Sequence, residues 1–281
     1  MDIAALAQYK DWIGRTDERH DVATAAPLVS LSALLDRDDP APKEGDPAPP
    51  LAHWLYFLPN YRQSEAGPDG HAQKGSFMPP VPLPRRMWAG SRLEFMRPLR
   101  VGSKITRVSR ITDVSPKEGR SGPLLFVTVR HEVSDEGGVV LTDEHDIVMR
   151  GETALANAPK PAATNEAWKR EIRPDPVLLF RYSAVTFNSH RIHYDLPYVT
   201  KVEGYPGLVV HGPLIATLLV DLFRRSRPDT VLRGYSFRAM RPLYDTAPFD
   251  TCGLPDEAAR TAKLWTRDAE GAVTMEATAR W

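Results

Sequence analysis

An internal repeat constrains this chain most, because a sequence written twice predicts a fold built twice. Residues 90–99, GSRLEFMRPL, share an initial glycine and the run Met-Arg-Pro-Leu with residues 234–243, GYSFRAMRPL, 144 positions later. Further on, residues 135–140, DEGGVV, resemble residues 268–273, DAEGAV, at the smaller offset of 133. Two matches in the same order indicate a duplication, with one intervening hairpin shorter in the second copy.

Each copy has the pattern of antiparallel strands joined by short turns. Residues 124–133, LLFVTVRHEV, and 273–281, VTMEATARW, alternate in places between apolar and polar side chains, the period of a half-buried strand. The sequences DEGG and DAEG are typical of hairpin turns. A connector rich in alanine and proline, residues 156–171, separates the copies. We therefore expect two units, residues 1–160 and 161–281.

Two segments predict helices. Residues 21–38, DVATAAPLVSLSALLDRD, offer Thr24 or Asp21 as the N-cap and place leucines along one face. Residues 211–225, HGPLIATLLVDLFRR, are apolar on nearly every side, so this helix should be buried inside a curved antiparallel sheet. No equally plain helix immediately precedes Gly90. The expected fold is α+β, a sheet with one buried helix in each half.

The composition argues against several kinds of partner. Lysine plus arginine and aspartate plus glutamate both number 36, so no net charge favours nucleic acid or an acidic membrane surface. The single cysteine, Cys252, cannot form an intrachain disulfide and fits a reducing compartment. No apolar run reaches the roughly 18–20 residues that cross a bilayer, and the charged N-terminal sequence does not resemble a signal peptide. We expect a soluble, cytoplasmic protein without a membrane partner.

The segment YSAVTFNSHRIHYD concentrates groups that transfer protons or bind metals. The apolar and aromatic residues on either side of NSHR, 178–187 and 192–199, are expected to be strands, with a loop between them. Two histidines of this segment lie three residues apart, and His211 follows at the start of the buried helix. A helix start carries free backbone N–H groups and a positive dipole end, which suit a nearby anionic oxygen.

Three interpretations fit these histidines. A zinc site would use His190, His193 and either His211 or Asp195, although their spacing matches no strong zinc pattern. A polar loop would leave the imidazoles to cap strands and satisfy backbone groups. An acid–base site would use them because an unperturbed pKa near 6.5 suits proton transfer at neutral pH.

Two segments resemble a known enzyme family. Residues 187–195, FNSHRIHYD, fit the spacing of the motif Gly-Asp-x-Asn-Pro-aliphatic-His-x-Asp of the MaoC-like, R-specific enoyl-CoA hydratases. With YPGLVVHGPL, residues 205–214, the chain is most similar to the branch of type 2 hydroxyacyl-thioester dehydratases and of mesaconyl-CoA and itaconyl-CoA hydratases. The resemblance implies a double hotdog, two tandem units in which a curved antiparallel sheet wraps a central helix. Residues 1–160 would be the divergent dehydratase-like half and residues 161–281 the MaoC-like catalytic half.

The family's functional residues fall on the second half. Its catalytic histidine falls on His193, its catalytic aspartate on Asn188 and its motif asparagine on His190, while the glycine whose amide holds the thioester oxygen falls on Gly212. Asn188 departs from the family pattern, because an amide cannot exchange a proton as a carboxylate does. His190 or Asp195 would then orient His193 or complete the proton path, and the sequence leaves that choice open.

The resemblance implies an acyl-CoA hydratase or dehydratase that needs no metal or redox cofactor, since coenzyme A arrives on the substrate. The glycines and prolines of residues 67–84 predict an irregular segment that is long enough to be a functional loop or lid. A cover over the site is expected from residues 67–90. An arginine in this cover would pair with the free carboxylate of a C4–C5 acyl group such as mesaconyl or itaconyl. The expected substrate contacts are Tyr182, His211, Arg85, Arg86 and Trp88.

Two other functions remain open at this point. One is a 3-hydroxyacyl-ACP dehydratase of fatty acid synthesis, and the other is a non-catalytic protein that binds acyl thioesters, which the missing aspartate would suit. Fold alone does not choose between them. In each case we expect a homodimer or a higher homo-oligomer.

Overall fold

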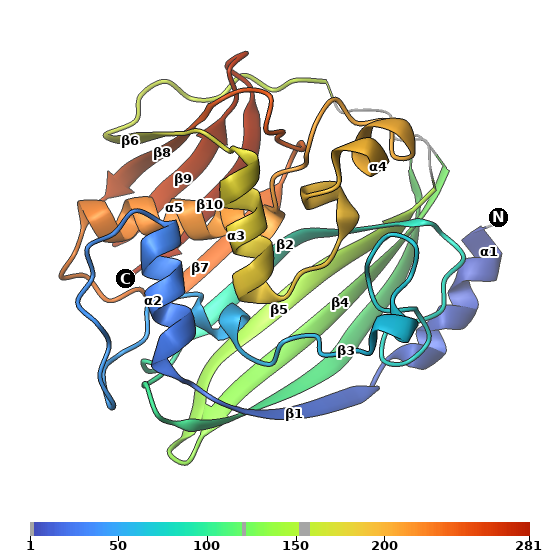
Figure 1. The fold of residues 1–281 in the computed structure, drawn as a ribbon, viewed down its shortest axis with the longest axis horizontal. Helices are drawn as coiled ribbons and strands as arrows, with labels where there is room; N and C mark the ends of the chain where they lie inside the picture. The colour runs from blue at the N-terminus through green and yellow to red at the C-terminus, as the bar shows by residue number, and fades with distance from the viewer. Residues whose placement is uncertain (1–2, 120–121, 152–157) are drawn as a thin grey trace.

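The two repeated segments form neighbouring strands in the middle of one sheet (Figure 1). The computed structural model describes residues 3–119, 122–151 and 158–281. Strands β2 (Arg85–Phe95) and β7 (Gly234–Ala239) pair antiparallel, and Arg92 lies opposite Ser236, its own counterpart in the repeat. An approximate twofold axis therefore passes between the halves at this pair, and the duplication predicted from sequence is confirmed.

The sheet has the same strand order when read from either edge. Its described residues form ten strands in the order β1-β3-β4-β5-β2-β7-β10-β9-β8-β6, so each half repeats the path of the other. The remaining strands are β1 (Thr16–Val22), β3 (Lys104–Gly119), β4 (Gly122–Asp135), β5 (Gly138–Arg150), β6 (Trp168–Ile172), β8 (Phe249–Asp256), β9 (Thr261–Arg267) and β10 (Val273–Arg280). The β8–β9 hairpin is shorter than the β3–β4 hairpin, which accounts for the smaller second offset.

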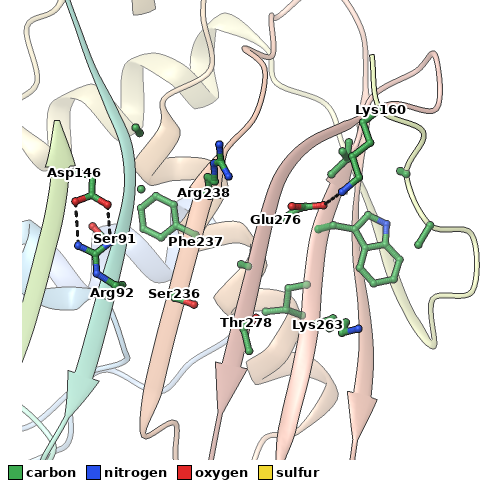
Figure 2. A pocket seen from close by; sticks show the side chains of 18 of the residues that line it. Ser91, Arg92, Asp146, Lys160, Ser236, Phe237, Arg238, Lys263, Glu276 and Thr278 are labelled. Atoms are coloured by element: carbon green, nitrogen blue, oxygen red, sulfur yellow. Dashed lines mark hydrogen bonds and ion pairs between the residues drawn. The ribbon is translucent and has the colours of Figure 1, made fainter. Parts of the chain in front are cut away.

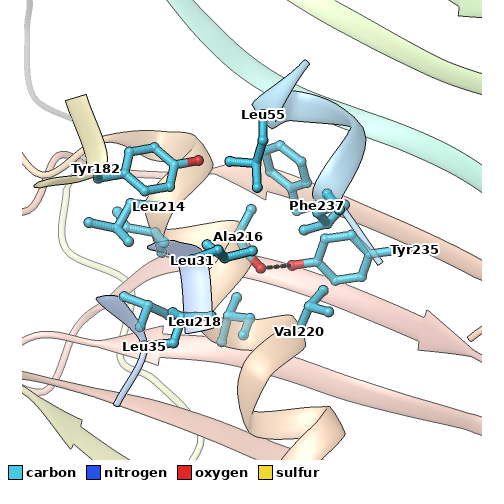
Figure 3. Packing of buried hydrophobic residues seen from close by; sticks show 14 of the residues in the cluster. Leu31, Leu35, Leu55, Tyr182, Leu214, Ala216, Leu218, Val220, Tyr235 and Phe237 are labelled. Carbon is cyan, nitrogen blue, oxygen red and sulfur yellow. Dashed lines mark hydrogen bonds between the residues drawn. The ribbon is translucent and has the colours of Figure 1, made fainter. Parts of the chain in front are cut away.

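The helices lie on one face of this sheet (Figure 1). The helical segments are α1 (Ile3–Leu6), η1 (Ala7–Trp12), α2 (Ala25–Leu34), η2 (Ala52–Leu55), η3 (Gln63–Glu65), α3 (Pro176–Thr186), η4 (Arg191–His193), α4 (Leu196–Lys201) and α5 (Gly212–Ser226). Helix α5 is buried from Leu214 to Phe223, as its apolar sequence predicts. Figure 3 shows its side chains packed among residues of both halves, with the Tyr235 hydroxyl donating to the Ala216 carbonyl oxygen at 3.0 Å.

The two halves differ in their helices. The predicted N-cap Thr24 does precede α2, and Leu28, Leu31 and Leu34 of this helix are buried. Yet α2 has only ten residues and packs against α3 of the second half. Within the described residues, the first half therefore has no helix as long or as enclosed as α5, which agrees with the lack of a plain helical pattern immediately before Gly90.

Two predicted strands are helical. Residues 178–187, expected to be a strand, belong mostly to α3, because Asp175 caps the helix by accepting from the Leu178 N–H at 2.8 Å and Pro176 occupies the first turn. Residues 192–199 form parts of η4 and α4, where Asp195 caps α4 by accepting from the Tyr198 N–H at 3.1 Å. Capping signals outweigh the apolar composition in both places.

The predicted irregular segment is confirmed. Residues 67–84 contain no named helix or strand, and strand β2 begins at Arg85, so the last part of the expected cover, residues 85–90, belongs to a strand. The boundary between residues 160 and 161 stays a prediction, because the start of the connector, residues 156–157, lies outside the described residues. None of the helices in the described ranges is long and apolar enough to span a membrane.

Candidate active site

The histidines of the motif lie together where α3, η4 and α5 meet. His190 precedes η4 as its N-cap, His193 ends it, and His211 is the N-cap of α5. The rings of His193 and His211 stack with their centroids 3.6 Å apart, and the ring of His190 meets that of His193 edge-on at 5.4 Å. The structure therefore brings together the three histidines that the sequence singles out.

His193 has the features of a general base. Its Nδ1 lies 2.7 Å from the Val209 carbonyl oxygen, which can only accept, so the ring proton sits on Nδ1 and Nε2 keeps a free lone pair. The side chain is 7% exposed, and this burial lowers its pKa to about 4. At neutral pH the imidazole is thus uncharged and ready to accept a proton.

His211 and Tyr182 pack on the side of His193 in turn: His211 stacks on His193, and Tyr182 contacts His211. His211 is fully buried, and its Nε2 lies 2.8 Å from the Ser183 hydroxyl. The ring of Tyr182, also buried, lies edge-on to His211 at 5.0 Å. Burial, followed by the neighbouring His193 and His190, lowers the pKa of His211 well below its usual value. These contacts position the stacked pair, and direct contact of either residue with substrate stays a prediction.

Asn188 follows the end of α3 and turns the chain towards the histidines. Phe187 before it adopts the left-handed conformation with φ 49°, and the Asn188 N–H donates to the Ser183 carbonyl oxygen at 2.8 Å, which closes the helix. The side-chain Oδ1 of Asn188 accepts from the backbone N–H of His190 at 3.0 Å. The amide thus holds the loop that carries His190.

Asp195 makes structural contacts. Its carboxylate caps α4 and accepts from both Nε and Nη2 of Arg191, at 2.9 and 2.8 Å. The pairing with Arg191 lowers the pKa of Asp195. Asp195 is thus a helix cap and the partner of Arg191, and its part in the proton path stays a prediction.

A loop from the first half covers the histidines. The Gly70 carbonyl oxygen accepts from the Tyr61 hydroxyl at 2.5 Å and from the Ser189 hydroxyl at 2.6 Å. The Arg191 N–H donates to the Asp69 carbonyl oxygen at 2.9 Å. Gly70 has φ +90°, and a Cβ there would lie 1.9 Å from the Ser189 carbonyl oxygen, so only glycine fits. The loop is therefore tied directly to the histidine motif of the second half.

This loop carries a carboxylate–imidazole pair that the motif comparison overlooked. Asp69 accepts twice from His71, through Oδ1 from the backbone N–H and through Oδ2 from Nδ1, each at 3.0 Å. The ring of His71 lies 4.0 Å from that of His190. The signal in the sequence was Asp-Gly-His inside a glycine-rich segment, but nothing there shows that it reaches residues about 120 positions later.

By distance alone, Asp69, His71 and His190 form a possible metal-binding group, with ligand atoms within 4.8 Å of one another. This differs from the zinc set considered from the sequence. The His71 Nδ1 is already bonded to Asp69, so the arrangement also suits a hydrogen-bonded pair.

The two candidate arginines of β2 have different partners. Arg85 forms an ion pair with Glu203 at 2.5 Å and donates to the Tyr205 hydroxyl at 3.1 Å. The Arg86 side chain makes no ion pair or hydrogen bond with another described residue; burial lowers its pKa, while the charge of Asp69 raises it. Its charge also lowers the pKa of His71 and His190, so it lies near both imidazoles. Of the two, Arg86 is the cation free to take an anionic ligand.

Gly212 begins α5 beside Trp88. Because it is the first helical residue, its N–H has no acceptor within the helix. The nearest atom to a Cβ placed on Gly212 is the Trp88 carbonyl oxygen at 4.0 Å, and the Trp88 ring packs on His145 with centroids 4.0 Å apart. The helix start is therefore an open donor site bounded by β2.

A groove of about 1170 Å³ lies on the face of the sheet turned away from α5 (Figure 2). Two ion pairs lie along it, Arg92 with Asp146 at 2.5 Å and Lys160 with Glu276 at 2.6 Å. No histidine among the described residues lines it. We place the candidate site at the histidines because proton-transfer groups gather there.

Comparison by sequence gives strong matches. A family model for hydroxyacyl-thioester dehydratase type 2 matches residues 51–245. The chain is 45% identical to mesaconyl-C(4)-CoA hydratase of Chloroflexus aurantiacus, over 97% of each chain. It is 26% identical to the mitochondrial hydroxyacyl-thioester dehydratase type 2 of Schizosaccharomyces pombe, over 77% of this chain and 79% of that one.

Comparison by structure confirms the fold. A MaoC-like dehydratase from Phytophthora capsici superposes with a TM-score of 0.71 at 17% identity, over 98% of both chains. A Mycobacterium tuberculosis protein described as a double hotdog superposes with a TM-score of 0.59 at 14% identity, over 95% of this chain and 96% of that one. The predicted α+β double hotdog is thus the fold of this chain.

Proposed function

Because this chain belongs to the hydroxyacyl-thioester dehydratase type 2 family, we propose that it is a hydro-lyase that adds water reversibly to a short enoyl-CoA bearing a free carboxylate. The best candidate is a mesaconyl-CoA. The observation that carries this proposal is the 45% identity to mesaconyl-C(4)-CoA hydratase over 97% of both chains. The chemistry of the site supports it independently.

Hydration of an enoyl thioester needs a base for water, a proton for Cα and a donor for the thioester oxygen. In this proposal the free Nε2 of His193 accepts the proton of the water that attacks Cβ. The Gly212 N–H, at the positive end of α5, donates to the thioester oxygen as it becomes enolate-like. Loss of one such donor typically lowers the rate about 10²–10³-fold.

The free carboxylate explains the choice of substrate. In mesaconyl-C4-CoA this carboxylate is attached to Cβ, the carbon that water attacks, so its receptor must lie close to the proton-transfer groups. Arg86 meets this requirement, since it acts on the pKa of both His71 and His190 and has no carboxylate partner among the described residues. Arg85 does not, since Glu203 already neutralises it.

The test compares mesaconyl-CoA with crotonyl-CoA, which lacks the carboxylate, by the loss of enoyl-thioester absorbance. The Arg86→Ala change should lower the mesaconyl-to-crotonyl ratio of kcat/KM about 10- to 150-fold, because a charge-assisted hydrogen bond contributes about 1.5–3 kcal/mol. The matched control, Arg85→Ala, should leave that ratio unchanged. A wild-type protein that hydrates neither substrate would refute the hydratase proposal, and an unchanged ratio in Arg86→Ala would refute the carboxylate receptor alone.

The same proposal includes a homo-oligomer, a cytoplasmic location and a reaction without a metal or redox cofactor. Sedimentation and cell fractionation test the first two. Replacing CoA by an acyl carrier protein in the assay separates the present proposal from a dehydratase of fatty acid synthesis, which would prefer the protein carrier.

A further inference from the structure

We infer that His71, held by Asp69, is the second proton-transfer group of the active site, so that the first half supplies the catalytic carboxylate–imidazole pair. The inference rests on the proposed hydratase function and deepens it. In this inference the covering loop takes part in the reaction itself, because it carries Asp69 and His71.

The need for such a group follows from Asn188. Hydration moves two protons, one away from water and one to Cα, and a single neutral imidazole does one of these at a time. Where the family pattern has an aspartate, this chain has Asn188, whose amide holds the His190 N–H and exchanges no proton. A second acid–base group must therefore come from elsewhere in the fold.

His71 has the required geometry. Asp69 accepts the Nδ1 proton at 3.0 Å, which fixes the tautomer and leaves Nε2 free for chemistry. The side chain of His71 is 26% exposed, and its ring packs against that of His190 with centroids 4.0 Å apart. Asp69 thus does for His71 what the Val209 carbonyl does for His193.

The pair is also held rigidly. The Asp69 carbonyl oxygen accepts from the Arg191 N–H, and the next residue, Gly70, is held by Tyr61 and Ser189. The bonds from Arg191 and Ser189 fix the pair relative to the segment that carries His190 and His193. Such constraint matters because a proton-transfer group must lie within hydrogen-bond reach of its substrate atom.

The proton balance of the proposed step closes. As the water O–H bond breaks, its proton goes to Nε2 of His193 and its oxygen bonds to Cβ. The π electrons move through Cα towards the thioester oxygen, and Cα takes a proton from Nε2 of a protonated His71. The step leaves His193 protonated and His71 neutral, and a proton passing between them through water restores the site.

Electrostatics link this step to the substrate. Burial lowers the pKa of His71 and the Asp69 hydrogen bond raises it, while the nearby cations Arg86 and Lys74 lower it. His190 is kept neutral, since burial and the neighbouring histidines lower its pKa to about 2. A substrate carboxylate on Arg86 would offset that cation and so favour the protonated form of His71.

The experiment compares His71→Ala and Asp69→Asn with a control, His20→Ala, in which the lost histidine lies exposed on β1. We expect kcat for mesaconyl-CoA to fall about 10²–10⁴-fold in His71→Ala, the usual contribution of a general acid or base, with a much smaller change in KM. Added imidazole should restore part of the rate.

Asp69→Asn should lower kcat less than His71→Ala does. It should also move the limb of the pH profile that reports His71 to lower pH, because the carboxylate that stabilises the protonated imidazole is lost. His20→Ala should match wild type.

Three results would overturn the inference. The first is a His71→Ala variant that keeps kcat while wild type hydrates mesaconyl-CoA, which leaves the proposed function intact. The second is a loss of activity that imidazole does not rescue and that comes with a lowered melting temperature, which would make the pair structural. The third is stoichiometric metal in the wild-type protein that a chelator removes together with the activity, which would make Asp69, His71 and His190 ligands instead.

Discussion

Two imidazoles stacked face to face cannot both carry a proton at low cost. His193 and His211 lie 3.6 Å apart and are buried, so the fold favours the neutral form of each. An imidazole kept neutral in this way can accept a proton, but it has no acidic proton to donate. At the scale of single residues, therefore, the stack suits the base of the proposed reaction, and the proposed acid is a residue outside it.

Asn188→Asp tests how the site responds to the carboxylate common in the family. We expect the variant to fold and to stay active, because an aspartate oxygen can still accept from the His190 N–H. The new negative charge should raise the pKa of the adjacent imidazoles by about 1–3 units and move the acid limb of the kcat/KM profile to higher pH. His193→Ala serves as the inactive reference for this measurement, because loss of the proposed base should abolish turnover. Loss of folding in Asn188→Asp would mean that the amide is needed structurally.

The sequence predicts single residues well only where one motif contains them. His190, His193, His211 and Gly212 lie within a short span and are found together at the start of α5. Asp69 and His71 lie about 120 residues earlier, and only the folded chain places them against His190. A motif comparison that examines one half of a duplicated protein cannot find a group that the other half supplies.

At the scale of elements, the loop that contains Gly67 and Gly75 depends on close backbone contact for its position. Its hydrogen bonds to Ser189 and Arg191 require the two backbones to approach at Gly70, where a side chain has no room. The position of the loop therefore depends on the missing side chain of Gly70 as well as on the hydrogen bonds to Ser189 and Arg191.

Gly70→Ala should displace this loop, because the added Cβ would lie 1.9 Å from the Ser189 carbonyl oxygen. Gly75→Ala is the matched control, since Gly75 also has a positive φ, +110°, but its added Cβ would meet only Pro80 at 3.7 Å. Both variants should lose about 1–3 kcal/mol of stability from backbone strain. Only Gly70→Ala should also lose most of its kcat with mesaconyl-CoA. Equal kcat values in the two variants would show that loop docking has no part in turnover.

Element types were predicted best where composition and capping agree. The apolar run of α5, with Pro213 in its first turn, leaves no alternative to a buried helix. The aromatic and aliphatic content of residues 178–187 predicts a strand. In the structure these residues are mostly helical, because Asp175 caps the helix and Pro176 occupies its first turn. Composition reports burial, and the residues at the ends of a segment decide between helix and strand.

At the scale of the whole molecule, the buried histidines make stability depend on pH. Six of the eight histidines have pKa values lowered by burial as the first cause, namely His53, His71, His131, His190, His193 and His211. The unfolded chain binds protons at these residues below about pH 6.5 while the folded chain does not. Acid should therefore favour unfolding well above the range in which carboxylates titrate.

We expect the free energy of unfolding to fall as the pH drops from about 6.5 towards the folded values, one of which is about 4 for His193. Each such histidine contributes up to about 1.4 kcal/mol per pH unit within its own window. Urea titrations at several pH values measure this slope directly. A free energy that stays constant between pH 7 and pH 5 would contradict the expectation, and His53→Gln should reduce the slope if the expectation holds.

The pairing of β2 with β7 at the centre of the sheet has a consequence for how the chain folds. During synthesis, one edge of β2 has no partner strand until β7 has been made, more than a hundred residues later. An unpaired sheet edge of this kind can pair with another chain. Contacts so distant in sequence form slowly, because a long loop must close before they are gained. We therefore expect the joining of the halves to be the late event of folding, and a newly made first half to depend on prompt synthesis of the second to avoid self-association.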